Sequence, residues 1–252
     1  MALEEYRSKR DFTRSPEPRG ADRPRQAKRT RFFCVQKHLA SRLHYDIRLE
    51  HDGVLLSWAV PKGPSLDPAD KRLAVHVEDH PLEYGEFEGI IPEGYGAGVV
   101  MLWDRGTWEP EVDDVEAALV KGDLKVTLDG YKRKGSWVLV RTRGYGGRPA
   151  ARDEGGSGES WLLIKHRDEW SGALDITTFA PLSVKSGGDF ADILTAELPA
   201  FWTSHVTPGH SDVAASLAGI VAKVEKLQGK PLAARSAPEP GTARRKTRKP
   251  SR

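Results

Sequence analysis

The stretch Gln36-Lys-His38-Leu-Ala-Ser-Arg-Leu-His44-Tyr-Asp46-Ile-Arg48-Leu-Glu50 contains a strand with two very different faces. Side chains alternate across a β-strand, so every second residue shares a face. The polar face consists of His44, Asp46, Arg48 and Glu50. The apolar face consists of Tyr45, Ile47 and Leu49 and must pack on a core, whereas the polar face contacts water or lines a hydrated cavity.

A second strand, Arg72-Leu-Ala-Val-His76-Val-Glu78-Asp-His80, repeats this pattern. The same period of two predicts one polar face with Arg72, His76, Glu78 and His80, opposite Leu73, Val75 and Val77. For either strand alone, a solvent-exposed polar face is the alternative. Two such strands favour a shared polar cavity.

Short apolar segments separated by Gly, Pro and Asp surround these two strands. The candidate strands are 32–37, 43–50, 54–60, 72–78, 98–103, 123–128, 136–142 and 160–165. This pattern is typical of a closed antiparallel sheet or barrel, so we expect a mainly β fold with a few flanking helices. One helix should begin after Asp113 or Asp114 and end at Gly122.

The region after Trp170 has a weaker strand signal. Residues 190–194 predict a helical turn, and residues 212–228 predict an amphipathic helix. The apolar stripe of that helix is Val213, Leu217, Ile220, Val221, Val224 and Leu227. We expect it to pack on the protein's own core, with a partner protein as the alternative. Residues 144–160 predict a mobile loop.

Charge is distributed unevenly along the 252 residues. Residues 1–31 contain ten Lys or Arg and five Asp or Glu, residues 229–252 contain eight and one, and the middle contains 21 and 30. We expect a basic N-terminal segment (1–31), a barrel domain (32–170), a C-terminal extension (171–228) and a disordered basic tail (229–252). The basic ends predict nonspecific contact with phosphate backbones, with solvated tails as the alternative.

The cysteine content and hydropathy indicate the compartment. Cys34 is the single cysteine, which excludes an internal disulfide framework, and the N-terminus lacks the apolar stretch of a secretory signal. No apolar run reaches the ~20 residues that a membrane-spanning helix needs. We therefore expect a cytoplasmic, nucleoid-associated protein without a membrane role.

Two histidines and a carboxylate can form a facial triad for a divalent metal ion, and His38, His44 and Asp46 are the natural set. Manganese, iron, zinc or cobalt would suit these ligands. Positive and proton-donating side chains near this set favour phosphate chemistry. They are Arg48, Lys62, Arg72 and His80. An iron-dependent oxygenase in a cupin-like barrel, which needs no such cations, is the remote alternative.

The remaining motifs carry less chemistry. Ile91-Pro-Glu-Gly-Tyr-Gly-Ala-Gly98 is glycine-rich but lacks the Lys-Ser/Thr of a phosphate-binding loop, so we interpret it as a turn. The histidines outside both polar faces are treated as incidental. They are His51, His166, His205 and His210.

Taken together, these stretches resemble the 3′-phosphoesterase domain of bacterial and archaeal DNA ligase D, which works in nonhomologous end joining. The resemblance spans roughly residues 5–170. It is carried by 9–18, 33–50, 53–64, 71–81, Tyr84, 87–89, 103–106 and 161–165. This combination is more specific than any single motif.

The resemblance implies a compact antiparallel β-barrel with a hydrophilic metal-binding cavity, in which His38, His44 and Asp46 bind Mn²⁺. It implies that Arg48 and His80 engage the phosphate and that activity requires Tyr84. Further matching pocket positions are Lys62, Arg72, Glu78 and Gln36, and Arg10, Asp11 and Glu17 match an N-terminal segment that contributes to activity. The implied reaction removes a 3′-terminal ribonucleoside and then the 3′-phosphate at primer-template or RNA–DNA ends.

The sequence departs from the family in three respects. The family's turn has one more residue between Gly94 and Tyr95. No Lys-x-Asp-Gly ligase motif is present, so we expect the chain to act alone or with a separate ligase, polymerase and end-binding protein. Residues 171–252 match only loosely. The shortened turn leaves open a second hypothesis, a catalytically weak module that binds or recruits DNA ends.

Overall fold

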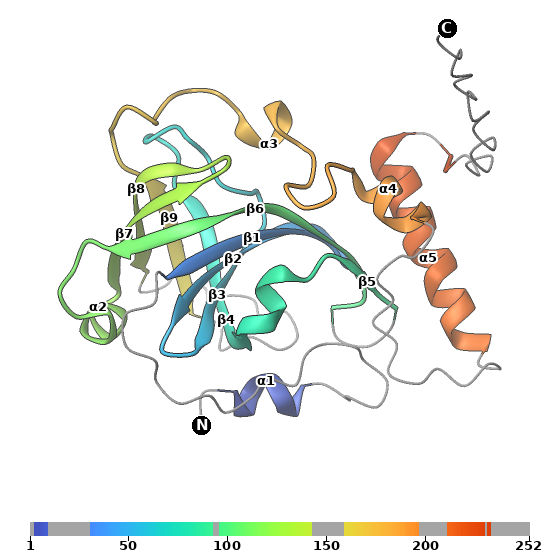
Figure 1. Ribbon diagram of the computed structural model, residues 1–252, viewed down its shortest axis with the longest axis horizontal. Coiled ribbons are helices and arrows are strands. Elements are labelled where there is room, and N and C mark those ends of the chain that lie inside the picture. The colour runs from blue at the N-terminus through green and yellow to red at the C-terminus, as the bar shows by residue number, and fades with distance from the viewer. Residues whose placement is uncertain are drawn as a thin grey trace, which may run out of the picture.

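The computed structural model describes residues 3–9, 31–92, 96–142, 159–196, 211–229 and 231–232, and its centre is an antiparallel β-barrel (Figure 1). The strand order is β1-β2-β3-β4-β9-β8-β7-β6, and pairing of β1 with β6 closes the barrel, while β5 extends the sheet beside β6. The strands are β1 (Phe32–Leu39), β2 (Leu43–His51), β3 (Val54–Val60), β4 (Arg72–Pro81), β5 (Gly89–Ile91), β6 (Gly98–Pro110), β7 (Asp123–Gly130), β8 (Lys134–Arg141) and β9 (Ser160–Lys165). All eight expected strands are confirmed, and the short β5 was missed.

Local sequence explains the tight connection between β2 and β3. Asp52 and Gly53 both have positive φ angles, 48° and 86°, and His51 pairs with Val54. A two-residue turn with two positive φ angles matches the right-handed twist of a hairpin, and Asp-Gly is a preferred sequence for it. The turn therefore fixes the register of β2 on β3.

The apolar faces of all eight barrel strands meet in one buried core. Representative core residues from β1, β2, β3, β4, β6, β7, β8 and β9 are Val35, Ile47, Trp58, Ala74, Trp103, Leu124, Trp137 and Trp161. Full burial of one large apolar side chain stabilises a fold by roughly 1.5–3 kcal/mol. The predicted alternation in β2 is confirmed, because Tyr45, Ile47 and Leu49 belong to this core.

The expected face of β4 is wrong in part, because the register of β4 on β3 shifts between Leu55 and Ser57. His80 pairs with Leu55, whereas His76 pairs with Trp58, three residues further along β3. Residues three apart on a strand point to opposite faces. Arg72 shares the core-side face of His76, so neither residue lies on the face of His80. An extra residue in β4, a β-bulge, is the physical reason.

Helix α2 (Val115–Lys121) follows the predicted start and stop signals. The side chain of Asp114 accepts a hydrogen bond from the backbone N–H of Ala117, and Gly122 ends the helix with a φ of 81°. This is the left-handed conformation that glycine adopts without steric cost. Asp114, and not Asp113, is thus the cap.

Within the described ranges, five further helical segments surround the barrel. They are α1 (Glu4–Ser8), the 3₁₀ helix η1 (Leu82–Glu86), α3 (Ile176–Phe179), α4 (Phe190–Thr195) and α5 (Ser211–Gln228). The predicted turn and amphipathic helix are confirmed as α4 and α5, which lie together at one side of the barrel (Figure 1). Ile220 and Val224 pack in the core, although Leu227 of the expected stripe is exposed.

Several expectations lie on residues outside the described ranges. They concern the N-terminal segment apart from 3–9 and 31, the turn at Gly94–Tyr95, most of the loop at 144–160, and nearly all of 229–252. None of the helices that the described ranges contain is both long and apolar enough to cross a membrane.

Candidate metal centre

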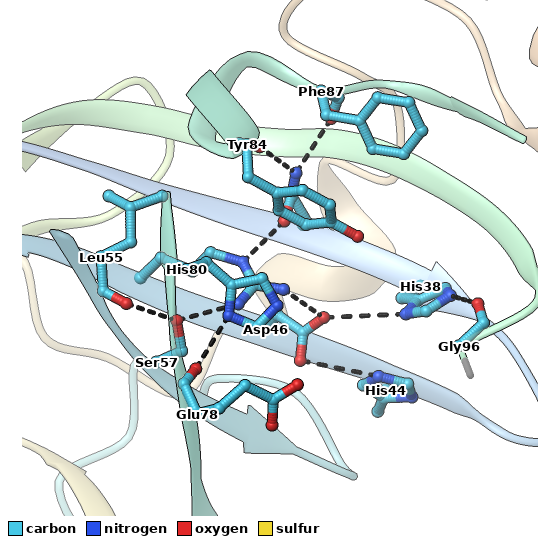
Figure 2. Close-up of polar contacts among 12 residues, drawn as sticks. His38, His44, Asp46, Leu55, Ser57, Glu78, His80, Tyr84, Phe87 and Gly96 are labelled. Atoms are coloured by element: carbon cyan, nitrogen blue, oxygen red, sulfur yellow. Dashed lines mark hydrogen bonds and ion pairs between the residues drawn. The ribbon is translucent and has the colours of Figure 1, made fainter. Parts of the chain in front are cut away.

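The β1–β2 hairpin brings three potential metal ligands together. His38 pairs with His44 across the two strands, and Gln36 pairs with Asp46 two residues further along each strand. One ligand atom each from His38, His44 and Asp46 lies within 4.8 Å of the other two (Figure 2). Residues that are distant by up to eight positions in sequence thus converge because the hairpin register places them on one face.

Both imidazoles are oriented as metal ligands are. Nε2 of His38 lies 2.9 Å from the carbonyl oxygen of Gly96, and Nδ1 of His44 lies 3.0 Å from that of Arg42. These nitrogens must carry the proton, because a carbonyl oxygen can only accept. A metal-ligating histidine commonly donates its second N–H to a carbonyl in this way. The unprotonated nitrogens, His38 Nδ1 and His44 Nε2, then face Asp46.

The spacing around Asp46 also fits a bound ion. His38 Nδ1 lies 3.7 Å from Asp46 Oδ2, and His44 Nε2 lies 3.6 Å from Asp46 Oδ1. Both separations exceed a normal hydrogen bond, so two lone pairs and a carboxylate surround a common point. Imidazole nitrogen with carboxylate oxygen is a donor set suited to divalent transition metals. The residues present therefore fit such an ion.

Electrostatics favour the metal-binding forms of Asp46 and His38, whereas the charge of Asp46 favours a protonated His44. Burial alone would raise the pKa of Asp46, but the charge of Arg48 and the contacts with both histidines hold that pKa well below its ordinary value. Burial lowers the pKa of His38. Burial also acts to lower the pKa of His44, but the charge of Asp46 and the hydrogen bonds to Asp46 and Arg42 together raise it. A charged carboxylate beside a neutral imidazole is the state that binds metal.

Arg48 contacts the candidate metal ligand Asp46 and adds a cationic group beside it. Its Nη2 donates to Asp46 Oδ2 at 3.1 Å, its Nε to Gln36 Oε1 at 2.7 Å, and its Nη1 to Ser57 Oγ at 2.9 Å. Among the described residues these bonds use three of the five guanidinium N–H groups. One N–H on each of Nη1 and Nη2 is left for a ligand, a pair suited to two oxygens of one phosphate.

Gln36 ties this network to η1. Its Nε2 donates to the carbonyl oxygens of both Tyr84 and Phe87 at 2.9 Å, while its Oε1 accepts from Arg48. Gln36 is fully buried, so every one of these bonds is shielded from water. The ring of Tyr84 lies 4.9 Å from the guanidinium carbon of Arg48, in cation–π range. Three hydrogen bonds and the ring of Tyr84 therefore fix the position of the guanidinium.

His80 lies beside this network between two aromatic rings. Its ring centroid is 4.9 Å from those of both Tyr84 and Tyr6. Nδ1 of His80 lies 2.8 Å from the carbonyl oxygen of Glu78 and must donate to it. This bond fixes the tautomer, so Nε2 is the nitrogen that can accept or return a proton.

Comparison with known proteins identifies the family. Residues 36–141 match the DNA Ligase D 3′-phosphoesterase domain. These residues belong to the DNA ligase D 3′-phosphoesterase family. The chain is also similar to the "Multifunctional non-homologous end joining protein LigD" of Pseudomonas aeruginosa. The two are 53% identical over 174 residues, which is 69% of this chain and 19% of that protein. The protein of the same name from Mycolicibacterium smegmatis is 40% identical over 191 residues, covering 73% of this chain and 23% of the relative.

A third relative has the same pattern of coverage. The "Multifunctional non-homologous end joining DNA repair protein LigD" of Mycobacterium tuberculosis is 46% identical over 145 residues, which is 56% of this chain and 18% of that protein. The chain thus spans about a fifth of the length of the relatives it matches. The similarity shows the domain family of these residues and does not show their activity.

Other predicted site residues of the phosphoesterase domain lie further from the triad. Lys62 is exposed in the turn after β3, and within the described ranges no hydrogen bond or ion pair joins it to the triad. Arg72 pairs with Asp70 at 2.7 Å, at the opposite end of β4 from His80. Glu78 is buried and pairs with Lys9. The predicted substrate contacts Arg10, Asp11 and Glu17 lie outside the described residues.

Sequence reasoning missed Ser57. This buried side chain accepts from Arg48 and donates to the carbonyl oxygen of Leu55 at 2.9 Å. The signal was present, because Ser57 is the lone polar residue in the apolar run of β3. The carbonyl partners of the histidines, at Arg42 and Gly96, carry no side-chain signal.

A second group of potential ligands, at the β2–β3 turn, differs in exposure. His51, Asp52 and Glu116 bring their ligand atoms within 4.8 Å of one another, but Asp52 and Glu116 are exposed. His51 Nε2 lies 3.1 Å from Glu116 Oε1. In a direct pair of this kind the imidazole nitrogen donates a proton to the carboxylate, so it has no lone pair for a metal ion. We therefore interpret the group as a surface ion pair.

Proposed function

We propose that the chain is a metal-dependent phosphoesterase that processes the 3′ ends of DNA with Mn²⁺, removing a terminal ribonucleoside and the 3′-phosphate. One observation carries this proposal. Asp46 joins both site types, because its carboxylate faces two unprotonated imidazole nitrogens and also accepts from Arg48. A metal position and a phosphate-binding guanidinium therefore share one carboxylate.

His38 Nδ1, His44 Nε2 and the carboxylate of Asp46 are the atoms that would hold the ion. A divalent ion in such a site polarises a phosphoryl oxygen and lowers the pKa of an attacking water. Manganese is the proposed ion, with other divalent transition metals as candidates, since this ligand set binds several of them. The two carbonyl oxygens of Arg42 and Gly96 keep the imidazoles oriented.

Arg48 and its partners would bind the phosphate. The two remaining guanidinium N–H groups can engage two phosphate oxygens, and this grip strengthens as charge develops on them. Gln36, Ser57 and Tyr84 hold the guanidinium in place before substrate arrives. Preorganised donors cost no rearrangement during the reaction.

His80 is the proposed proton donor. Hydrolysis of a 3′-phosphate forms a bond from a water oxygen to phosphorus and breaks the bond from phosphorus to the 3′-oxygen. The departing 3′-oxygen needs a proton to become a hydroxyl, and Nε2 of protonated His80 can supply it. The bond from Nδ1 to the carbonyl of Glu78 keeps Nε2 as the exchanging nitrogen.

The substrate and the repair role rest on the domain family. Relatives carry the name of a non-homologous end joining protein, so we propose DNA 3′ ends at primer-template or RNA–DNA junctions as substrates. Arg10, Asp11 and Glu17 are proposed contacts of the DNA around the site, whereas Lys62 and Arg72 lie away from the triad and are given no contact. A separate ligase, polymerase and end-binding protein are the proposed partners.

The test uses the full chain with Mn²⁺ and a labelled primer-template that ends in a 3′-phosphate or in one 3′-ribonucleotide. Asp46→Asn keeps the shape but removes the shared charge, and we expect turnover to fall more than about 100-fold, because loss of a residue that merely orients a ligand costs up to that much. His166→Ala, whose imidazole contacts Ser136 away from the cluster, is the matched control and should keep parent activity. Absence of a 3′-hydroxyl product from the parent with any divalent metal would reject the proposal.

A further inference from the structure

The half of β4 that carries His80 is paired less regularly than the half that begins at Arg72. β9 pairs with β4 at Arg72–Val75, and its partners there are residues 160–163. On the other side, the register of β3 on β4 shifts between the pairs Ser57–Val77 and Leu55–His80. The segment Glu78–Asp79 therefore lies at an irregularity in the ladder, where a β-bulge loosens regular pairing.

Helix α1 packs on this segment from outside the barrel. Tyr6 is fully buried and forms a small apolar cluster with Leu3 and Val54. Its ring meets the imidazole of His80 edge to face, at 4.9 Å between centroids and 61° between planes. Aromatic pairs in this geometry attract beyond the burial of their surfaces. The His80 ring is thus enclosed by Tyr6 on one side and Tyr84 on the other.

A second contact holds the side chain of Glu78, the residue whose carbonyl oxygen bonds His80. Lys9, in the residue after α1, lies 3.2 Å from Glu78 Oε2 and 2.8 Å from Glu5 Oε1. The side chain of Glu78 is 1% exposed, so this ion pair is shielded from solvent on the Glu78 side. The carbonyl oxygen of Glu78 accepts the Nδ1 proton of His80. Lys9 therefore acts on the residue that sets the tautomer of His80.

We propose that α1 is a clamp for His80, with Tyr6 and Lys9 as positioning residues for the phosphoesterase reaction. This inference rests on the function proposed above. Tyr6 sets the plane of the imidazole, and Lys9 holds the side chain of Glu78, whose carbonyl oxygen sets the rotation of the imidazole. Without the clamp, the bulged segment of β4 leaves His80 several orientations, and a small misplacement of a reacting group lowers its rate on the order of 10- to 100-fold.

The kinetic test compares Tyr6→Leu with Tyr6→Phe in the full chain. Phenylalanine keeps the edge-to-face ring and leucine removes it, so turnover should fall for Tyr6→Leu with unchanged KM and should recover in Tyr6→Phe. In a His80→Ala background, Tyr6→Leu should cause no further loss. Ser8→Ala is the matched control on α1, because among the described residues its hydroxyl bonds the carbonyl of Glu5 alone, at an exposed position.

A second variant keeps the inference testable where Tyr6→Leu unfolds the protein. Lys9→Met removes the ion pair with Glu78, and Lys9→Arg retains it, so turnover should fall in the first and recover in the second. Thermal unfolding of each variant, measured alongside, separates positioning from general destabilisation.

An NMR measurement without substrate separates this inference from the proposed function. The imidazole ¹⁵N shifts of His80 should report a fixed Nδ1–H tautomer in the parent and an averaged one in Tyr6→Leu. A parent without activity would reject the function and leave this comparison intact. Turnover of Tyr6→Leu within about twofold of the parent, or His80 shifts identical in both, would overturn the clamp.

Discussion

Two buried arginine–aspartate pairs, one on β2 and one between β6 and the β7–β8 turn, differ in almost every contact. Arg48 and Asp46 lie on the face covered by η1, and Arg133 and Asp104 lie in the core. All three nitrogens of Arg48 donate to protein oxygens. In Arg133, Nε donates to Asp104 at 3.3 Å, whereas Nη1 and Nη2 are buried and, within the described residues, have no hydrogen-bond partner.

The aspartates differ in charge environment as well. Burial outweighs the neighbouring cations and raises the pKa of Asp104, and burial also lowers the pKa of Arg133. The pKa of Asp46 is instead held far below its ordinary value. Asp104 accepts from the backbone N–H groups of Lys132 and Arg133, so it shapes the β7–β8 turn. Burial of an ion pair alone therefore indicates no function. The imidazole nitrogens of His38 and His44, which face Asp46, distinguish the candidate site from the core pair.

The largest expected effect is on stability, at the core pair. Arg133→Met should lower the free energy of unfolding by about 3–5 kcal/mol, because it leaves the Asp104 carboxylate buried without its cation. Chemical denaturation measures this directly. Adding Asp104→Asn to Arg133→Met should restore part of the loss, and turnover per folded molecule should stay at the parent value. A loss below about 1 kcal/mol would mean that the pair is already hydrated.

The matching change at the site should act on activity. Arg48→Lys keeps a charge but loses the planar fork, and we expect kcat/KM to fall about 100- to 1000-fold, as for loss of a preorganised charge-stabilising donor. Steady-state kinetics with a 3′-phosphate substrate checks this. Arg133→Lys is the paired control, and an equal loss of activity in both variants would erase the distinction between the two pairs.

A smaller loss is expected at Ser57, which bonds Arg48 Nη1. Ser57→Ala leaves one buried N–H of a charged group without its partner, which costs about 1–3 kcal/mol and should reduce kcat about tenfold or more. Ser57→Thr keeps the hydroxyl and should retain most activity. Equal activity in Ser57→Ala and the parent would show that Gln36 and Asp46 suffice to orient the guanidinium.

The smallest effects concern pH. The folded pKa of Asp46 is depressed, so its ionised form stabilises the protein above the unfolded value, and this contribution is lost as pH falls through the folded pKa. Asp104 has a raised folded pKa, so ionisation costs stability above the unfolded value and acidification removes that cost. Each unit of difference contributes about 1.4 kcal/mol.

Carboxyl ¹³C NMR measures both groups in one titration. The Asp46 signal should change at lower pH than that of an ordinary aspartate, and the Asp104 signal should change at higher pH. The reverse order of titration would contradict the contrast between the two pairs.

Much of the fold was predictable because its signals are local. Alternation in 43–50 set the two faces of β2, and Asp114 with Gly122 set the ends of α2. The face of β4 was mispredicted because a bulge has no signature in a period-two pattern, and the register shift becomes visible only in the pairing with β3. Helix α1 is too short for periodicity to identify it.

The site divides in the same way. His38, His44, Asp46 and Arg48 were predicted because hairpin register follows from strand spacing and converges them on one face. The contacts that orient them depend on tertiary structure, since Tyr6 reaches His80 from far along the chain. Backbone carbonyls, such as that of Gly96, are invisible to residue-type reasoning.

Anomalous X-ray diffraction at the manganese edge, from crystals of the full chain soaked in Mn²⁺, tests the central claim most directly. The account predicts a peak bounded by His38 Nδ1, His44 Nε2 and the carboxylate of Asp46, and its loss in Asp46→Asn. A peak only at His51, Asp52 and Glu116, or none at the triad in the parent, would contradict it.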